Sequence, residues 1–166
     1  MLQTRQPFPV KQLLLAILLV GSLDIISAFI DVWIANRTMP DKVLKYIASA
    51  VFGKEALAGG ISMTIMGLVF HFIIAGSFTV LFYFLYPTLL RWIRNKIFMA
   101  FLYALFMWIV MTFIVLPLTP LNRGSVVPLK TIKAVLSLTV AIGLPLSFMM
   151  GRFIPFRANL KMENDI

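Results

Sequence analysis

The chain has 166 residues, of which 61% are hydrophobic and 13% are charged, whereas soluble domains are about 45–50% apolar and ~25% charged. A water-soluble domain of this size exposes too much surface to hide so many apolar side chains, so the composition excludes that class. It predicts an integral membrane protein with one domain, 1–166. The net charge of +9 comes mostly from basic residues that flank apolar runs, so we expect contacts with anionic lipid headgroups and no nucleic-acid partner.

The sequence contains no cysteine and a single histidine. Disulfides, thiol catalysis and Cys-ligated metals are therefore excluded, and one imidazole cannot build a metal site alone. No phosphate-binding loop, nucleophile elbow or HExxH motif is present. A serine hydrolase built from Asp24, Ser27 and His71 would need water in the middle of the membrane, and Ser27 lies one turn from Asp24. We expect no enzyme, no catalytic or metal-binding residue and no cofactor.

Four apolar runs have the ~20 residues needed to cross a ~30 Å hydrocarbon core. They cover about 13–35, 60–86, 97–119 and 134–150. We predict an all-α, polytopic membrane protein with four transmembrane helices in an antiparallel bundle. The first span is expected to remain as an uncleaved insertion signal, because an aspartate interrupts its apolar stretch and no A-x-A cleavage site follows. The polar tail, 156–166, is expected to be frayed.

A short amphipathic helix is predicted at about 41–52, between the first two spans. Apolar side chains recur there at helical spacing and polar ones fall on the other side; the apolar set is Val43, Leu44, Ile47 and Val51, and the polar set is Lys42, Lys45 and Ser49. Thr38 is expected to cap this helix and Gly53 to end it. We expect it to lie in the membrane interface, as a cover for the bundle mouth, a lid over a polar cavity or a docking surface.

Prolines predict two irregular places in the second half of the chain. The 120–133 connection contains Pro120, Gly124 and Pro128 and is expected to be an irregular loop. Pro145, close to Gly143, is expected to kink the fourth span.

The basic residues indicate the orientation weakly. Eight lie on the side of the termini and seven on the opposite side; the first set is Arg5, Lys11, Arg91, Arg94, Lys96, Arg152, Arg157 and Lys161, and the second is Arg37, Lys42, Lys45, Lys54, Arg123, Lys130 and Lys133. Three of the first set lie in a short turn, predicted at 87–96, between two strongly apolar spans. This placement favours both termini in the cytoplasm.

Two stripes of small and polar residues follow the first two spans at spacings of three and four. The first comprises Gly21, Asp24, Ser27, Ala28 and Asp31, and the second comprises Gly60, Thr64, Gly67, His71 and Ala75. Small residues allow helices to approach closely in lipid, so we expect the stripes to face each other or the bundle centre. At 1.5 Å per residue, antiparallel neighbours would place Asp24 and His71 at nearly the same depth, near the middle of the bilayer.

An aspartate at a helix centre costs about 2.5–3.5 kcal/mol on insertion scales, so it needs a partner. We expect Asp24 to accept a hydrogen bond from His71. The same count places Asp31 near Thr64, closer to the surface. The candidate polar or ligand site is therefore Asp24, Ser27, Asp31, Thr64 and His71. It is either a proton-carrying or ligand-polarising site, or a polar clasp that holds the register of two helices.

Several short segments resemble small inner-membrane proteins of a bacterial four-helix family with no assigned activity. These are Gly21-Ser22-Leu23-Asp24, Ile47-Ala48-Ser49-Ala50 with Gly53, and Gly59-Gly60 followed by Gly67 and His71-Phe72. The resemblance covers roughly residues 20–75. It implies a multi-pass protein of the bacterial inner membrane and draws attention to Asp24 together with His71, but it implies no substrate or cofactor.

Two functions are compatible with these patterns. The first is a non-enzymatic accessory or assembly module that contacts other membrane-protein subunits, with Asp24 and His71 as a buried polar pair. The alternative is a proton-linked transporter or small-molecule binder that uses the same two residues. Because four helices seldom enclose a complete transport path, the transporter would require self-association.

Overall fold

The computed structural model describes residues 10–121 and 127–153, and no strand occurs in these residues. Four helical rods are long and apolar enough to cross a membrane: Val10–Asn36, Ile61–Trp92, Lys96–Leu118 and Pro128–Arg152. This confirms the all-helical class and the four spans, and it indicates a multi-pass membrane protein. The predicted tail, 156–166, lies outside the described residues.

The first two rods are single helices and the last two are composite. The single helices are α1, Val10–Asn36, and α3, Ile61–Trp92. The third rod is α4, Lys96–Val110, continued by a π-helix η2, Met111–Val115, and a 3₁₀ turn η3, Leu116–Leu118. The fourth rod is α5, Pro128–Leu138, then a π-helix η4, Thr139–Gly143, then α6, Leu144–Phe153.

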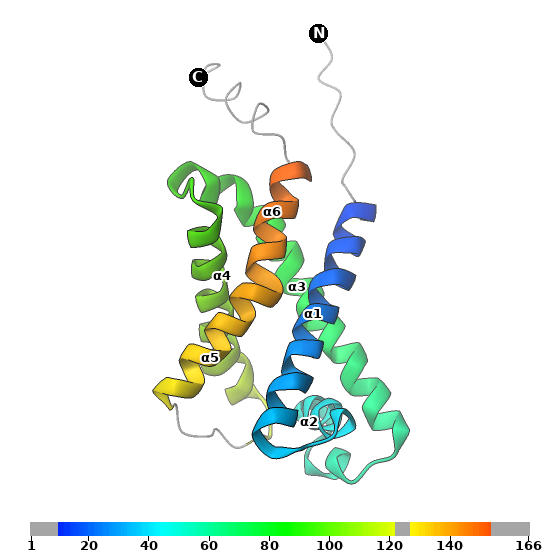
Figure 1. The fold of residues 1–166 in the computed structure, drawn as a ribbon. Helices are drawn as coiled ribbons and strands as arrows, with labels where there is room; N and C mark the ends of the chain where they lie inside the picture. The colour runs from blue at the N-terminus through cyan, green and yellow to red at the C-terminus, as the bar shows by residue number, and fades with distance from the viewer. Residues whose placement is uncertain (1–9, 122–126, 154–166) are drawn as a thin grey trace.

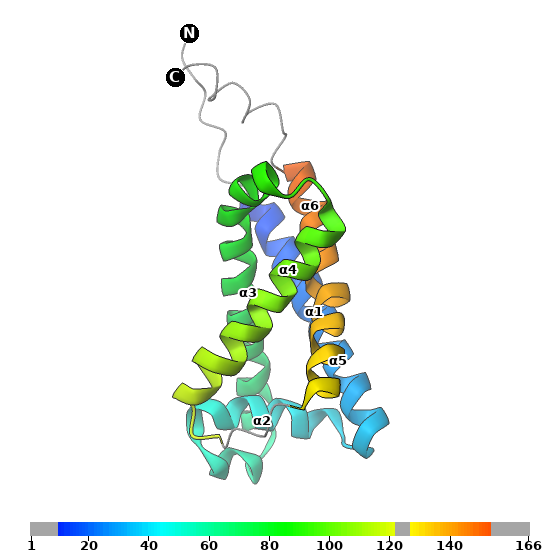
Figure 2. The same ribbon diagram turned by 90° about the vertical axis from the view of Figure 1, so that its left-hand side faces the viewer.

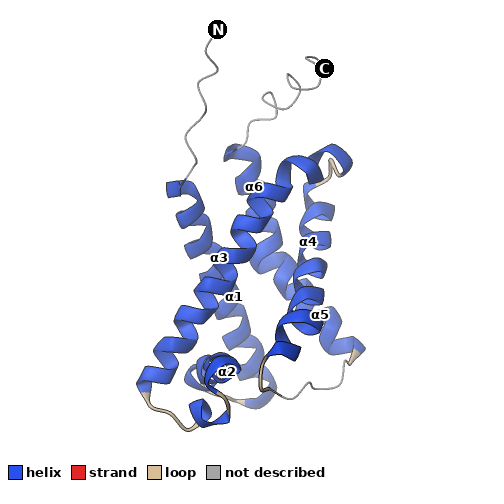
Figure 3. Cartoon of the chain, turned by 180° about the vertical axis from the view of Figure 1, so that it is seen from behind, coloured by secondary structure: helices blue, strands red, loops and turns tan. Residues whose placement is uncertain are grey.

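The four rods run alternately up and down, so that α1 begins and α6 ends at the same end of the molecule (Figure 1). Helix α2, Pro40–Phe52, lies across the opposite end (Figure 2) and leads through a 3₁₀ turn η1, Lys54–Leu57, into α3. Short loops join α1 to α2 and α3 to α4, as Figure 3 shows. The fold therefore has one end that carries the chain ends and one end that α2 crosses.

The packed core lies in the half of the bundle near the chain ends. Its fully buried side chains come from α1, α3, α4 and α6: Ala16, Val20, Phe82, Tyr86, Met99, Leu146 and Met150 are the main ones. Tyr103 joins the rods by donating a hydrogen bond of 2.6 Å to the carbonyl oxygen of Phe78. Toward α2 the rods diverge (Figure 1), and the cavity described below lies in that half.

The predicted turn at 87–96 is much shorter in the structure. Helix α3 continues through Pro87 to Trp92, and only 93–95 separate it from α4. A proline is tolerated inside a membrane helix when its surroundings satisfy the freed backbone groups. The side chain of Asn95 then caps α4 by accepting hydrogen bonds from the backbone N–H groups of Ile97 and Phe98, at 2.9 and 3.2 Å.

Helix α2 occupies the predicted range, but its start and one of its faces differ from the prediction. Met39 stands at the N-cap with no side-chain hydrogen bond, so Thr38 is not the cap; Pro40 follows, and its fixed φ favours helix initiation. Gly53 ends the helix with φ 76°, as predicted. Ser49, expected on the polar side, is buried. Its hydroxyl donates a 2.7 Å hydrogen bond to the carbonyl oxygen of Tyr46, which satisfies the buried polar group.

Prolines act differently at the two predicted irregular places. Pro128 begins α5 in place of extending the loop, as expected for a proline at the first position of a helix. Pro145 is the second residue of α6, which begins directly after the π-helix η4. Its missing N–H leaves the regular hydrogen-bond pattern interrupted, so the irregularity predicted near Pro145 and Gly143 is present as a π-helical segment.

Candidate functional site

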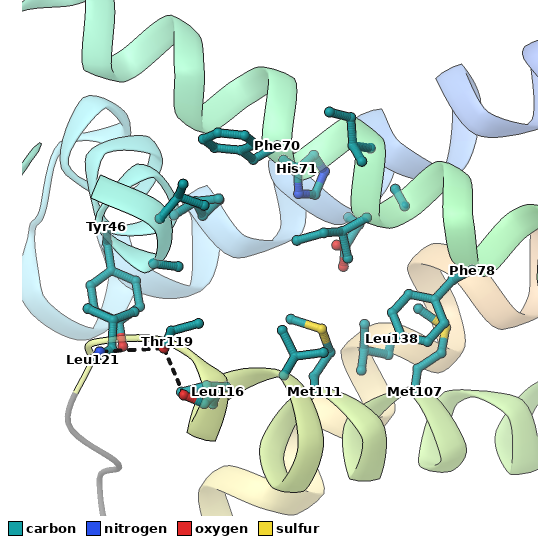
Figure 4. Close-up of a pocket in the computed structure, with 18 of the residues that line it drawn as sticks. Tyr46, Phe70, His71, Phe78, Met107, Met111, Leu116, Thr119, Leu121 and Leu138 are labelled. Carbon is teal, nitrogen blue, oxygen red and sulfur yellow. Dashed lines mark hydrogen bonds between the residues drawn. The ribbon is translucent and has the colours of Figure 1, made fainter. Parts of the chain in front are cut away.

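A pocket of about 460 Å³ lies between α1, α2, α3 and the two composite rods (Figure 4). Most of its lining is apolar or aromatic: Ile47, Ala50, Val51, Phe70, Ile73, Ile74, Ala75, Phe78, Met107, Met111, Val115, Leu116, Leu121, Leu138 and Ile142. Asp24 from α1 and His71 from α3 also line it, with Tyr46 and Thr119 as further polar residues. A mostly apolar pocket with a few convergent polar groups is typical of a small-molecule site.

His71 connects α3 to the backbone of α1. Its Nε2 lies 2.8 Å from the carbonyl oxygen of Gly21, and because a carbonyl oxygen only accepts, Nε2 carries the hydrogen and donates it. A Cβ atom on Gly21 would lie 2.7 Å from Cε1 of Phe72, which is too close for a real side chain. The glycine therefore permits the close approach of the helices that brings His71 to the α1 backbone.

Asp24 is half-buried and lines the same pocket as His71. Within the described residues the hydrogen bond of His71 goes to Gly21, and none joins its ring to Asp24. The expected direct hydrogen bond between the two side chains is therefore not formed. No side-chain polar atom in the described residues is both buried and unpaired, so the oxygen atoms of Asp24 remain accessible.

The other three candidate residues do not join this pair. The hydroxyl of Ser27 forms a hydrogen bond with that of Ser137 on α5. Asp31 is exposed and Thr64 is half-buried, and neither lines the pocket. Gly67, in the same stripe as Thr64, faces the backbone of Leu44 on α2, so part of the second stripe packs against α2 and not against α1.

Sequence reasoning missed the part of the site that comes from the second half of the chain. The η2–η3 segment and the residues after it contribute Met111, Val115, Leu116, Thr119 and Leu121, and the fourth rod contributes Leu138 and Ile142. Pro117 and Pro120 near the end of the third span indicate an interrupted helix end. Apolar residues at such an end have no feature that distinguishes a cavity wall from a lipid-facing surface.

The site can bind and polarise a ligand, but it lacks the groups for metal chemistry. Among the described residues, no three His, Asp or Glu side chains are grouped so that they could hold a metal ion. Comparison of the chain with protein-family models, curated proteins and solved structures finds no match. The geometry of the pocket therefore carries the functional argument.

Proposed function

We propose that the chain is a non-enzymatic membrane protein that binds a small lipophilic molecule inside its helix bundle. The observation that carries this proposal is the pocket of about 460 Å³ in which Asp24 and His71 share an otherwise largely apolar lining. A structural clasp would need only a direct contact between the two side chains, without a cavity. The open pocket supports binding over a purely structural role for the pair.

The same proposal includes a placement in the membrane. The four rods form an antiparallel bundle across the bilayer of a bacterial inner membrane, with both termini in the cytoplasm. Helix α2 lies in the opposite interface and covers the pocket with Tyr46, Ile47, Ala50 and Val51. Its ion pair between Lys45 and Asp41, at 3.3 Å, suits a headgroup environment, because amphipathic interfacial helices keep charged groups in the polar layer.

A substitution that fills the pocket tests the proposed function. Ala50 lines the pocket from α2, so Ala50→Phe should occupy part of the space and exclude the ligand. The readout is mass spectrometry of small molecules extracted from affinity-purified protein. We expect the wild type to retain a lipophilic molecule in stoichiometric amount and Ala50→Phe to lose it.

Ala58→Phe is the matched control, because Ala58 is exposed and does not line the pocket. It should retain the molecule in the same amount as the wild type. Equal small-molecule content in all three proteins, or no retained molecule in any of them, would contradict a binding function for the pocket.

A further inference from the structure

The described lining of the pocket can carry negative charge at one place only. Asp24 is the only acidic residue among the described residues that line the pocket, and no lysine or arginine is among them. A carboxylate far from water is costly unless a positive group or hydrogen-bond donors compensate it. Besides the His71 ring, the donors of the described lining are the hydroxyl groups of Tyr46 and Thr119, and Figure 4 shows both further along the pocket, toward α2.

The hydrogen bond of His71 limits what that ring can offer. Nε2 donates to the carbonyl oxygen of Gly21, so in the neutral ring the remaining nitrogen, Nδ1, is an acceptor. Asp24, when ionised, is also an acceptor only. The carboxylate of Asp24 and Nδ1 of His71 are therefore both acceptors, and a ligand that binds them must supply hydrogen-bond donors.

The remaining walls fit an apolar body. Figure 4 shows Phe70, Phe78, Met107 and Met111 around the space next to His71, with Tyr46, Thr119 and Leu121 further along it toward α2. Aromatic faces attract cations, and the flexible methionine side chains adapt to irregular apolar shapes.

We propose that the ligand is a lipophilic primary or secondary amine, bound as its ammonium ion. Its N–H groups donate to the carboxylate of Asp24 and to Nδ1 of His71, and its apolar part fills the space between α2, α3 and the composite rods. This assignment rests on the proposed binding function and specifies the chemistry of its ligand. A neutral hydroxyl donor would satisfy the acceptors but would leave the charge of Asp24 uncompensated.

Equilibrium binding to the full chain in nanodiscs of zwitterionic lipid tests the assignment. The probes are dodecylamine, dodecanol, dodecanoate and dodecyltrimethylammonium, which share one chain, and empty nanodiscs correct for partition into lipid. We expect saturable binding of dodecylamine at least about tenfold tighter than that of dodecanol, as a charge-assisted hydrogen bond provides. Dodecyltrimethylammonium, which lacks N–H donors, should bind more weakly than dodecylamine, and dodecanoate should not bind.

Two aspartates on α1 provide a matched pair of variants. Asp24→Asn keeps the shape but removes the charge, and it should weaken dodecylamine binding about tenfold while leaving dodecanol binding unchanged. Asp31→Asn removes an exposed carboxylate outside the pocket and should have no effect. His71→Gln keeps a donor for Gly21 and an acceptor in its amide oxygen, but that oxygen does not occupy the position of Nδ1, so it should weaken the binding of the amine less than Asp24→Asn does.

The outcomes separate the two levels of the proposal. Tight binding of dodecanol or dodecanoate with weak binding of dodecylamine would overturn the amine assignment and preserve the binding function. An equal loss of amine binding in Asp24→Asn and Asp31→Asn would also overturn the assignment, because it would indicate attraction to the surface. Saturable binding of none of the four probes would refute both. The comparison of probes on the wild type requires no variant to fold.

Discussion

Two glycines determine how closely α3 approaches its neighbours. At Gly21 the missing side chain leaves room for Phe72 and brings His71 to the α1 backbone. At Gly67 the carbonyl group of Leu44 on α2 occupies the place where a Cβ atom would stand. Close packing of small residues and interhelical hydrogen bonds drive helix association in lipid, where apolar burial does not. Replacement of Gly21 or Gly67 by a larger residue is therefore expected to weaken the association of the helices.

Gly67→Ala should destabilise the protein by about 1–3 kcal/mol, the usual cost of overpacking, because the backbone of α2 cannot yield as a flexible side chain can. Gly76→Ala, on the same helix, is the control: its Cβ would lie 3.5 Å from Ile17, an ordinary contact. Unfolding free energies measured in detergent or bicelles should separate the two variants. A loss of similar size in both would show that helix propensity or flexibility, and not the contact with α2, is the cause.

At the scale of the helices, the interruptions of the third and fourth rods coincide with the pocket. The π-helix η2 contributes Met111 and Val115 to the lining, and η4 contributes Ile142. π-Helices are rare, and the single-turn ones found within α-helices often lie at functional sites. The pocket-lining side chains of the third rod lie before, within and after η2, and those of the fourth rod lie before and within η4.

Pro145→Ala tests this role of η4. The new N–H can donate to the carbonyl oxygen of Ala141, which favours a regular α-helix over 139–143 and rotates Leu138 relative to Ile142. We expect slower amide hydrogen exchange over 139–144 and weaker binding of dodecylamine. Pro87→Ala is the control, because Pro87 lies inside α3 and does not line the pocket. Unchanged exchange and unchanged binding in Pro145→Ala would show that η4 does not depend on this proline.

At the scale of the whole molecule, the fold divides into a packed half and an open half. Core side chains fill the bundle near the chain ends, and the pocket lies toward α2. The proposed orientation places the packed half toward the cytoplasm. Access to the pocket would then lie on the opposite side of the membrane, near Tyr46 and Thr119.

Single cysteines test the orientation cleanly, because the chain has no cysteine of its own. Lys54, in η1, and Arg94, in the 93–95 turn, are exposed at opposite ends of α3. In intact cells a membrane-impermeant maleimide should label Lys54→Cys directly and Arg94→Cys only after the membrane is permeabilised. The reverse pattern would place both termini outside.

The sequence predicted the helices well but the contacts of the site only in part. The presence of four apolar spans, the helix predicted at about 41–52 and its end at Gly53 depend on local residues, and these predictions agree with the structure. The turn at 87–96, the cap at Thr38 and the polar-side position of Ser49 were wrong. Helix α3 continues through Pro87, α2 begins at Pro40 after an uncapped Met39, and the hydroxyl of Ser49 bonds to a carbonyl group of its own helix. Asp24 and His71 do line one cavity, whereas Ser27, Asp31 and Thr64 lie elsewhere.

The amino-acid sequence by itself indicated a lipid environment and the number of long helices. A run of about 20 apolar residues in lipid must satisfy its own backbone hydrogen bonds, and a helix does so. Only the tertiary structure decided that His71 donates to the carbonyl oxygen of Gly21 and leaves Asp24 accessible in a cavity. Stripes of small residues on two helices can pack against several neighbouring helices equally well. The rotation of each helix, and the phase changes at η2 and η4, select one arrangement among them.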